Sequence, residues 1–255
     1  MSFTLNHENL PNEMWLEIFA HLDEGSYTTS YTPFQPLPGV ESEVDVKSAY
    51  TTLVLVCRSW HDWAISFLYR NLRIPDSYSI WTHNHPEYGR WVRLPDQSNA
   101  ATFSCSDQVR RAILPYSLTM SDSPVTLILG LCPNTEVLIR PQLSNFIVEF
   151  DTLCPQLPSL KRLEWWWNYG SSINSLLAVL SAAPNLEYLF VGTQGFQPIN
   201  FIPGHTPDIH LPRLRTLRLR PALSPASTHL DQAISEWSLP ALDTLVLDTQ
   251  MGLAR

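Results

Sequence analysis

The most constraining feature of this sequence is a proline that returns five times in its second half, each time followed by leucines at fixed distances. The prolines are Pro133, Pro158, Pro184, Pro212 and Pro240. Their spacing is 25, 26, 28 and 28 residues. The fifth residue after each proline is a leucine: Leu138, Leu163, Leu189, Leu217 and Leu245. Four of the five units also carry a leucine two residues after the proline: Leu160, Leu186, Leu214 and Leu242. Chance does not hold such a register five times, so the chain should be built from stacked units.

A period of about 20–29 residues with the spacing Leu-x-x-Leu-x-apolar is typical of leucine-rich repeats. Each unit is expected to supply one short strand and one returning segment, and neighbouring units share a core because none covers its own apolar face. Returning helices are predicted at Phe146–Leu153, Ile173–Leu180 and Leu230–Trp237, and an irregular loop at Gly192–His210. We therefore predict an α/β fold in which residues 75–255 form an irregular leucine-rich-repeat array, with parallel strands on a concave face and helices or loops on the convex face.

Two segments ahead of the regular units are patterned less clearly. Arg90–Leu94 alternates like a strand and could be a degenerate first member of the array. Asp107–Leu118 is predicted to be a helix, with Val109, Ala112 and Ile113 on one face.

Strand alternation assigns side chains to the two faces of the predicted array. If Leu163 and Trp165 point into the core, then the residues that alternate with them, such as Arg162 and Glu164, point to the concave face. The predicted protein-binding residues there are Arg162, Glu164, Trp166, Tyr188, Phe190, Arg218 and Arg220. Aromatic residues and arginine anchor protein interfaces, so an exposed aromatic–arginine patch should hold a target protein. The alternative is that a loop, such as Gly192–His210, covers this surface and that it binds nothing. The first unit leaves its register open, because Arg140 falls where a core residue belongs.

The N-terminal part contains a second strongly apolar stretch, Leu53–Leu72. Apolar residues recur there at steps of three and four, as on one buried helical face, and further apolar residues fall off that stripe. The stripe is Leu53, Val56, Cys57, Trp60, Ala64, Phe67 and Leu68. A segment that is apolar on several sides either lies deep in a core or covers a partner.

The order of residues in this stretch, together with that of an earlier one, resembles the sequence motif of a known family. Leu10–Leu22, read as LPNEMWLEIFAHL, is similar to the opening of an F-box, and Val56–Trp60 with Leu68–Leu72 is similar to its second half. The F-box is a three-helix module that docks on the Skp1 adaptor of cullin-based ubiquitin ligases. The resemblance covers residues 1–74, apart from a Pro-, Ser- and Thr-rich insert at about 23–45 that departs from the family's short loop and is expected to be disordered. It also places a turn near Arg58–His61, where spacing alone predicts one continuous helix.

The F-box resemblance implies which residues face Skp1 and which proteins are partners. The implied Skp1-facing residues are Leu10, Pro11, Ile18, Leu22, Val56, Cys57, Trp60 and Trp63. The implied function is that of a substrate-recognition adaptor of a Skp1–cullin–F-box ubiquitin ligase, in which other subunits perform the ubiquitin chemistry. One alternative is a leucine-rich-repeat scaffold with no ligase role, which the insert favours. Another is an enzyme with an unrecognised site.

Composition and the missing motifs narrow the possible classes of function and the cellular compartment. The net charge of −8 without a Lys/Arg run argues against nucleic-acid binding. Four widely spaced cysteines without a C-x-x-C pair fit a reducing compartment better than a disulfide framework or a zinc site. The pair His83 and His85 has no third ligand nearby, so no metal site is predicted. Without a signal peptide, a membrane-length apolar run or a catalytic motif, we expect a cytoplasmic or nuclear protein that needs no cofactor and is not an enzyme.

Overall fold

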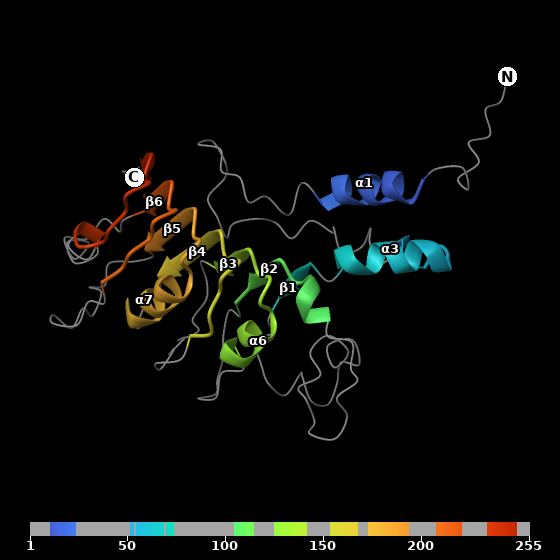
Figure 1. Cartoon of the computed structure of the whole chain (residues 1–255), viewed down its shortest axis with the longest axis horizontal. Coiled ribbons are helices and arrows are strands. Elements are labelled where there is room, and N and C mark those ends of the chain that lie inside the picture. Colours follow the sequence, from blue (N-terminus) through green and yellow to red (C-terminus); the bar gives the residue numbers. More distant parts are fainter. Residues whose placement is uncertain are drawn as a thin grey trace, which may run out of the picture.

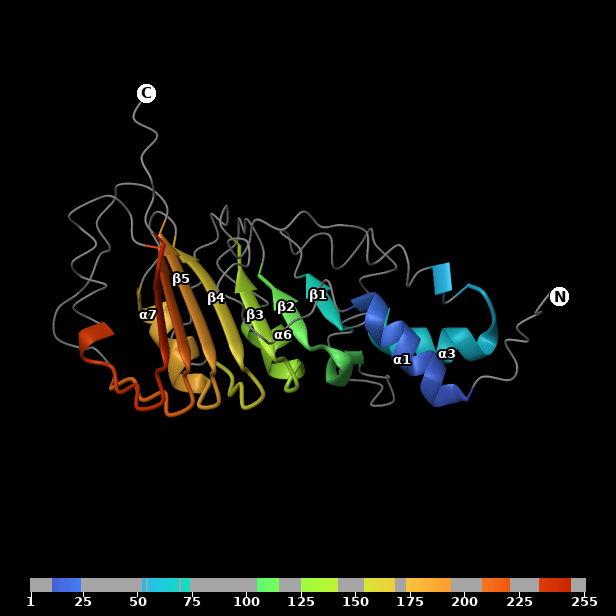
Figure 2. The same ribbon diagram turned by 90° about the horizontal axis from the view of Figure 1, so that it is seen from above.

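The structure is a computed structural model that describes residues 11–23, 52–53, 55–68, 70–73, 105–114, 125–141, 154–167, 173–193, 208–220 and 234–248. Its centre is a parallel sheet of seven strands whose spatial order follows the sequence from β1 to β7 (Figures 1 and 2). The strands are β1 (Asn71–Arg73), β2 (Arg111–Ile113), β3 (Val137–Arg140), β4 (Arg162–Trp167), β5 (Tyr188–Thr193), β6 (Thr216–Arg220) and β7 (Thr244–Leu247). All six pairs of neighbouring strands are parallel, so the predicted α/β class with parallel strands is confirmed.

The five spaced leucines lie directly beside one another in this sheet. Leu138 pairs with Leu163, Leu163 with Leu189, Leu189 with Leu217, and Leu217 with Leu245. The first four are at most 1% exposed. The stacking of the leucine register that the spacing predicts is therefore confirmed.

The prolines occupy the second position of a turn that precedes each of the last five strands. In every turn the backbone N–H of the residue two places after the proline donates to the carbonyl of the residue before it. These bonds run from Thr135 to Cys132, Leu160 to Leu157, Leu186 to Ala183, Leu214 to Leu211 and Leu242 to Leu239. Proline presets the φ angle that this turn position needs and has no N–H to leave unpaired. The spacing of the prolines in the sequence is thus the spacing of the turns that precede these strands.

Two helices, α6 (Val125–Leu131) and α7 (Ile173–Ala182), cover one face of the sheet, which we call the helix face (Figure 1). The predicted helix at Ile173–Leu180 is confirmed, whereas α6 was not predicted. Of the predicted helix at Leu230–Trp237, residues 234–237 are described: Ile234 and Ser235 are helical, whereas Glu236 and Trp237 lie in a turn and a bend. The strand β5 runs to Thr193 and so takes the first residues of the predicted loop. Phe146–Leu153 and Arg90–Leu94 lie outside the described residues.

The helix predicted at Asp107–Leu118 is wrong. A single 3-10 turn, η2 (Cys105–Gln108), is followed directly by β2. The backbone N–H groups of Arg110 and Arg111 donate to the carbonyl of Arg70, and Leu114 N–H donates to the carbonyl of Ile139. Pairing with strands on both sides satisfies the backbone here, and this tertiary arrangement overrides the helical spacing.

The N-terminal region contains α1 (Asn12–Asp23) and α3 (Arg58–Leu68), which pack beside each other near β1 (Figure 2). Thr52 and Leu53 are helical, and a turn at Leu55–Val56 separates them from α3. The continuous helix that spacing predicts is wrong, and the break lies a few residues before the position that the F-box resemblance implies. The chain then enters β1, inside the predicted module, and pairs with β2. In the described part of the chain, no helix is both long and apolar enough to cross a lipid bilayer.

Candidate functional site

The first candidate surface lies on the two N-terminal helices, which share a small aromatic core. The ring centroids of Trp15 and Trp60 are 4.9 Å apart, and Phe19 lies 5.5 Å from Trp60 and 6.4 Å from Phe67. Phe19, Ala64 and Phe67 are buried in this cluster. Edge-to-face rings at these distances stabilise each other beyond their area of contact, so α1 and α3 form one body.

The structure divides the predicted Skp1-facing residues into two groups. Pro11, Ile18, Val56 and Cys57 are exposed. Trp60 and Trp63 instead pack partly buried against the aromatic core. Leu10 lies outside the described residues, and the side chain of Leu22 does as well. The turn at Leu55–Val56 accounts for the exposure of Val56 and Cys57, because it takes them off the helical stripe that buries Trp60.

The sequence analysis did not identify all of the apolar side chains that are exposed in this region. Together with Ile18 and Val56, which are 41% and 55% exposed, three further large apolar side chains reach solvent here: Met14 at 49%, Leu16 at 39% and Leu55 at 80%. We call these five residues the N-terminal apolar surface. Met14 lies one helical turn before Ile18, a spacing that could have identified it. Leu55 carried no such signal, because its exposure depends on the turn.

The second candidate surface is the sheet face opposite the helices. The predicted alternation is confirmed, since Leu163 and Trp165 lie in the large core of the helix face while Trp166, Tyr188 and Phe190 form a separate cluster. We call this second side the polar-aromatic face. It consists of Arg162, Glu164, Trp166, Tyr188, Phe190, Arg218 and Arg220.

The expected exposure of this face is wrong. Trp166, Tyr188 and Phe190 are at most 2% exposed, and Arg162, Glu164 and Arg218 are at most 7% exposed. Of the seven residues, Arg220 alone is partly exposed. The physical reason lies in the side chains that adjacent strands bring together.

Arginines lie over the aromatic rings of the polar-aromatic face. The guanidinium carbon of Arg162 is 4.7 Å from the Tyr188 ring centroid, that of Arg218 is 5.9 Å from Phe190, and that of Arg220 is 5.6 Å from Trp166. The Trp166 and Phe190 rings meet edge to face at 5.1 Å. Cation–π stacking therefore occupies faces of these rings, whereas residues 194–207 of the loop that was the alternative cover lie outside the described residues.

Two of the three arginines on this face pair with carboxylates of the same chain. Arg162 Nε donates to Glu164 Oε1 at 2.7 Å, two residues along the same strand. Arg218 reaches Asp248, just after β7, with two hydrogen bonds. Burial, and next the negative charge of Glu164, raise the pKa of the Tyr188 phenol well above its usual range. Tyr188 thus stays protonated at physiological pH.

Arg140, whose register the sequence left open, pairs with Trp165. It is 1% exposed, with its guanidinium carbon 5.1 Å from the Trp165 ring centroid. Burial lowers the pKa of the Arg140 guanidinium to about 10. A cation therefore occupies a core position of the helix face, supported by the indole ring.

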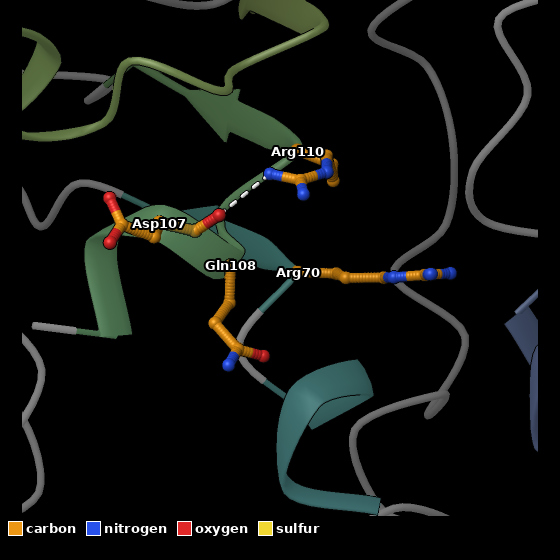
Figure 3. Close-up of a pocket in the computed structure, with 4 residues that line it drawn as sticks. All are labelled: Arg70, Asp107, Gln108 and Arg110. Carbon is orange, nitrogen blue, oxygen red and sulfur yellow. Dashed lines mark hydrogen bonds between the residues drawn. The ribbon is translucent and has the colours of Figure 1, made fainter. Parts of the chain in front are cut away.

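A shallow pocket of 270 Å³ lies where the chain passes from α3 into the sheet, lined by Arg70, Asp107, Gln108 and Arg110 (Figure 3). Arg110 Nη1 donates to the Asp107 carbonyl at 2.7 Å, and its Nε lies 3.7 Å from Glu136. The Arg70 guanidinium carbon lies 4.5 Å from the Phe67 ring centroid. Both cations thus have contacts within the chain.

Among the described residues, no three His, Cys, Asp or Glu side chains are grouped so as to hold a metal ion. His83 and His85 lie outside them. Comparison with protein-family models, with curated proteins and with solved structures finds no match for this chain.

Proposed function

We propose that this protein is the substrate-recognition adaptor of a Skp1–cullin–F-box ubiquitin ligase. In this proposal residues 1–74 are an F-box-like module that docks on Skp1. Residues 75–255 are a leucine-rich-repeat array that binds a target protein. The protein itself performs no chemistry, and the cullin is reached through Skp1.

The observation that carries the proposal is the N-terminal apolar surface. Five large apolar side chains are exposed on α1 and on the turn before α3, although the same helices have already buried an aromatic core. Met14 and Ile18 lie one turn apart on α1, and Leu16 points to another side of it. Large apolar side chains left exposed on a small helical body are a common mark of protein–protein contact. Two of them, Ile18 and Val56, are residues that the F-box resemblance assigns to Skp1 docking.

The stacked leucines support the second half of the proposal. A sheet that adds one parallel strand per proline–leucine unit offers a continuous row of side chains to a partner. Because most of the polar-aromatic face is buried, its accessible member Arg220 and the partly exposed Thr216 and Thr244 are where a target would first make contact.

A scaffold without a ligase role remains the second candidate, and one observation favours it. The carbonyl of Arg70, two residues after α3, accepts hydrogen bonds from both Arg110 and Arg111, which ties the helices to the first strands. Such a helical body at the end of a strand array can serve as its cap and recruit nothing.

The test is recovery of the full-length chain on purified Skp1. Wild type should bind, and the pair Ile18→Lys/Val56→Lys should lose binding at least ten-fold, since two charges would enter an apolar contact. Glu17→Lys introduces the same side chain at another exposed position of α1 and should bind as wild type does. If wild type recovers no Skp1, the adaptor function is rejected and the scaffold function remains. If the double variant binds normally, the docking surface is elsewhere.

A further inference from the structure

The last strand of the described sheet, β7, carries apolar side chains that its predecessors bury. Leu217 and Leu219 of β6 are 1% and 8% exposed, whereas their partners Leu245 and Leu247 in β7 are 56% and 59% exposed. Both lie on the helix face. In the described part of the chain β7 pairs with β6 alone, and no described strand lies along its other edge.

The hydrogen bonds to β6 show which backbone groups face that other edge. The N–H groups of Thr244 and Asp248 donate to carbonyls of Arg215 and Leu219 in and beside β6. Even-numbered residues of β7 thus turn their backbone groups inward. The N–H and C=O of Leu245 and Leu247 therefore point outward, so the same two residues offer unpaired backbone groups and exposed apolar side chains.

We propose that two copies of this protein pair antiparallel through β7, with Val246 on the two-fold axis. Leu245 of one copy then faces Leu247 of the other, and the two exchange both backbone hydrogen bonds, as hydrogen-bonded antiparallel pairs do. The four leucines gather on one side of the joined sheet. On the other side Val246 faces its own copy, and Thr244 faces Asp248.

Self-complementarity singles out a second copy as the occupant. In this register apolar residues face apolar residues, and a threonine hydroxyl faces a carboxylate. A shift of two residues either way sets Asp243 against Leu247, or Asp248 against Val246. A shift of one residue turns the leucines to the wrong face. Only the register centred on Val246 pairs apolar with apolar side chains, forms the backbone hydrogen bonds and keeps the aspartates away from apolar residues. A symmetric interface requires this self-complementarity.

A disulfide across the axis tests this arrangement. Facing residues in a non-hydrogen-bonded antiparallel pair have Cα atoms about 4.5 Å apart, within the range that a disulfide spans. In the full chain with the exposed Cys57 changed to Ser, Val246→Cys should form an oxidised dimer. Thr244→Cys is the matched control. It lies on the same side of the same strand, but its two copies would be roughly 14 Å apart along the strands.

We expect at least ten-fold more dimer from Val246→Cys than from Thr244→Cys on a non-reducing gel. Adding Leu245→Lys and Leu247→Lys to Val246→Cys should remove the difference, because lysines would face one another. Circular dichroism verifies that each variant is folded. Equal yields from the two cysteine variants, or no dimer from Val246→Cys, would overturn the proposal. If the wild-type chain self-associates in sedimentation while Val246→Cys forms no crosslinked dimer, the contact lies elsewhere and the proposal is overturned as well.

Discussion

Arg218 donates two hydrogen bonds to Asp248, with Nε 2.6 Å from Oδ2 and Nη2 3.0 Å from Oδ1. Arg218 is in β6 and Asp248 directly follows β7, so the pair joins the last two described strands on the polar-aromatic face. The Arg218 side chain is 6% exposed and that of Asp248 is 22% exposed. A two-pronged contact of this kind combines charge with a defined orientation.

Breaking this pair should destabilise the protein. Asp248→Asn is expected to lower the free energy of unfolding by about 2 kcal/mol, less than a fully buried pair because Asp248 still reaches water. Urea unfolding measures the change. Lys161→Ala, which removes one of the two cations beside Glu136 in a more exposed pair at 3.1 Å, should cost under about 1 kcal/mol. Equal losses from the two variants would contradict the assigned role of burial.

Gly192 should not tolerate a methyl group. A Cβ at this position of β5 would lie 2.6 Å from Trp166 Cε3 and 2.8 Å from Phe190 Cζ. Because both rings are packed, Gly192→Ala is expected to lower the free energy of unfolding by about 1–3 kcal/mol. The matched control is Gly130→Ala in α6, where the nearest atom, Pro155 Cβ, is 3.7 Å away. That variant should be neutral or more stable, since alanine favours a helix by up to about 1 kcal/mol. Thermal unfolding of both variants decides.

The leucine ladder should show a gradient of importance. Leu189 is 0% exposed, and Leu189→Ala is expected to lower the free energy of unfolding by about 2–5 kcal/mol through the cavity it leaves. Leu245 holds the same place in its unit but is 56% exposed, so Leu245→Ala should cost under about 1 kcal/mol. Chemical denaturation at a protein concentration low enough to keep monomers compares the two. A large loss from Leu245→Ala would show that its position is covered.

The cysteines should differ in reactivity. Burial raises the pKa of the Cys132 thiol to about 11 and that of Cys154 to about 12. Since the thiolate is the reactive form and a raised pKa disfavours it, fewer than about one in a thousand of these thiols is ionised at pH 8. Cys57 is exposed. Alkylation at pH 8 followed by peptide mass spectrometry should label Cys57 first, and Cys132 and Cys154 only after denaturation. Labelling of Cys132 in the native protein at the rate of Cys57 would contradict the burial of its side chain.

The sequence predicted the two faces of the sheet better than it predicted their surroundings. Alternation placed Leu163 on one side and Trp166 on the other, because successive side chains of a strand point in opposite directions. It could not show that Arg162 and Arg220 would lie over the aromatic rings. These residues are separated along the chain, and only the pairing of neighbouring strands brings them together.

The N-terminal region was predicted in a similar way. The apolar stripe located the helix that contains Trp60, Ala64 and Phe67, because that stripe depends on residues three and four apart. The turn at Leu55–Val56 has no glycine or proline to announce it, and this turn exposes Val56 and Cys57. The helix expected at Asp107–Leu118 is wrong for a different reason, since β2 within it pairs with strands on both sides.

By itself, the sequence determined the repeating unit, the leucine register and the parity of strands β4 to β7, because these depend on spacing along the chain and on where proline sets the backbone. The tertiary structure alone decided what is buried, which charges pair and where apolar side chains stay exposed. Those outcomes depend on neighbours in space, which a one-dimensional pattern does not contain.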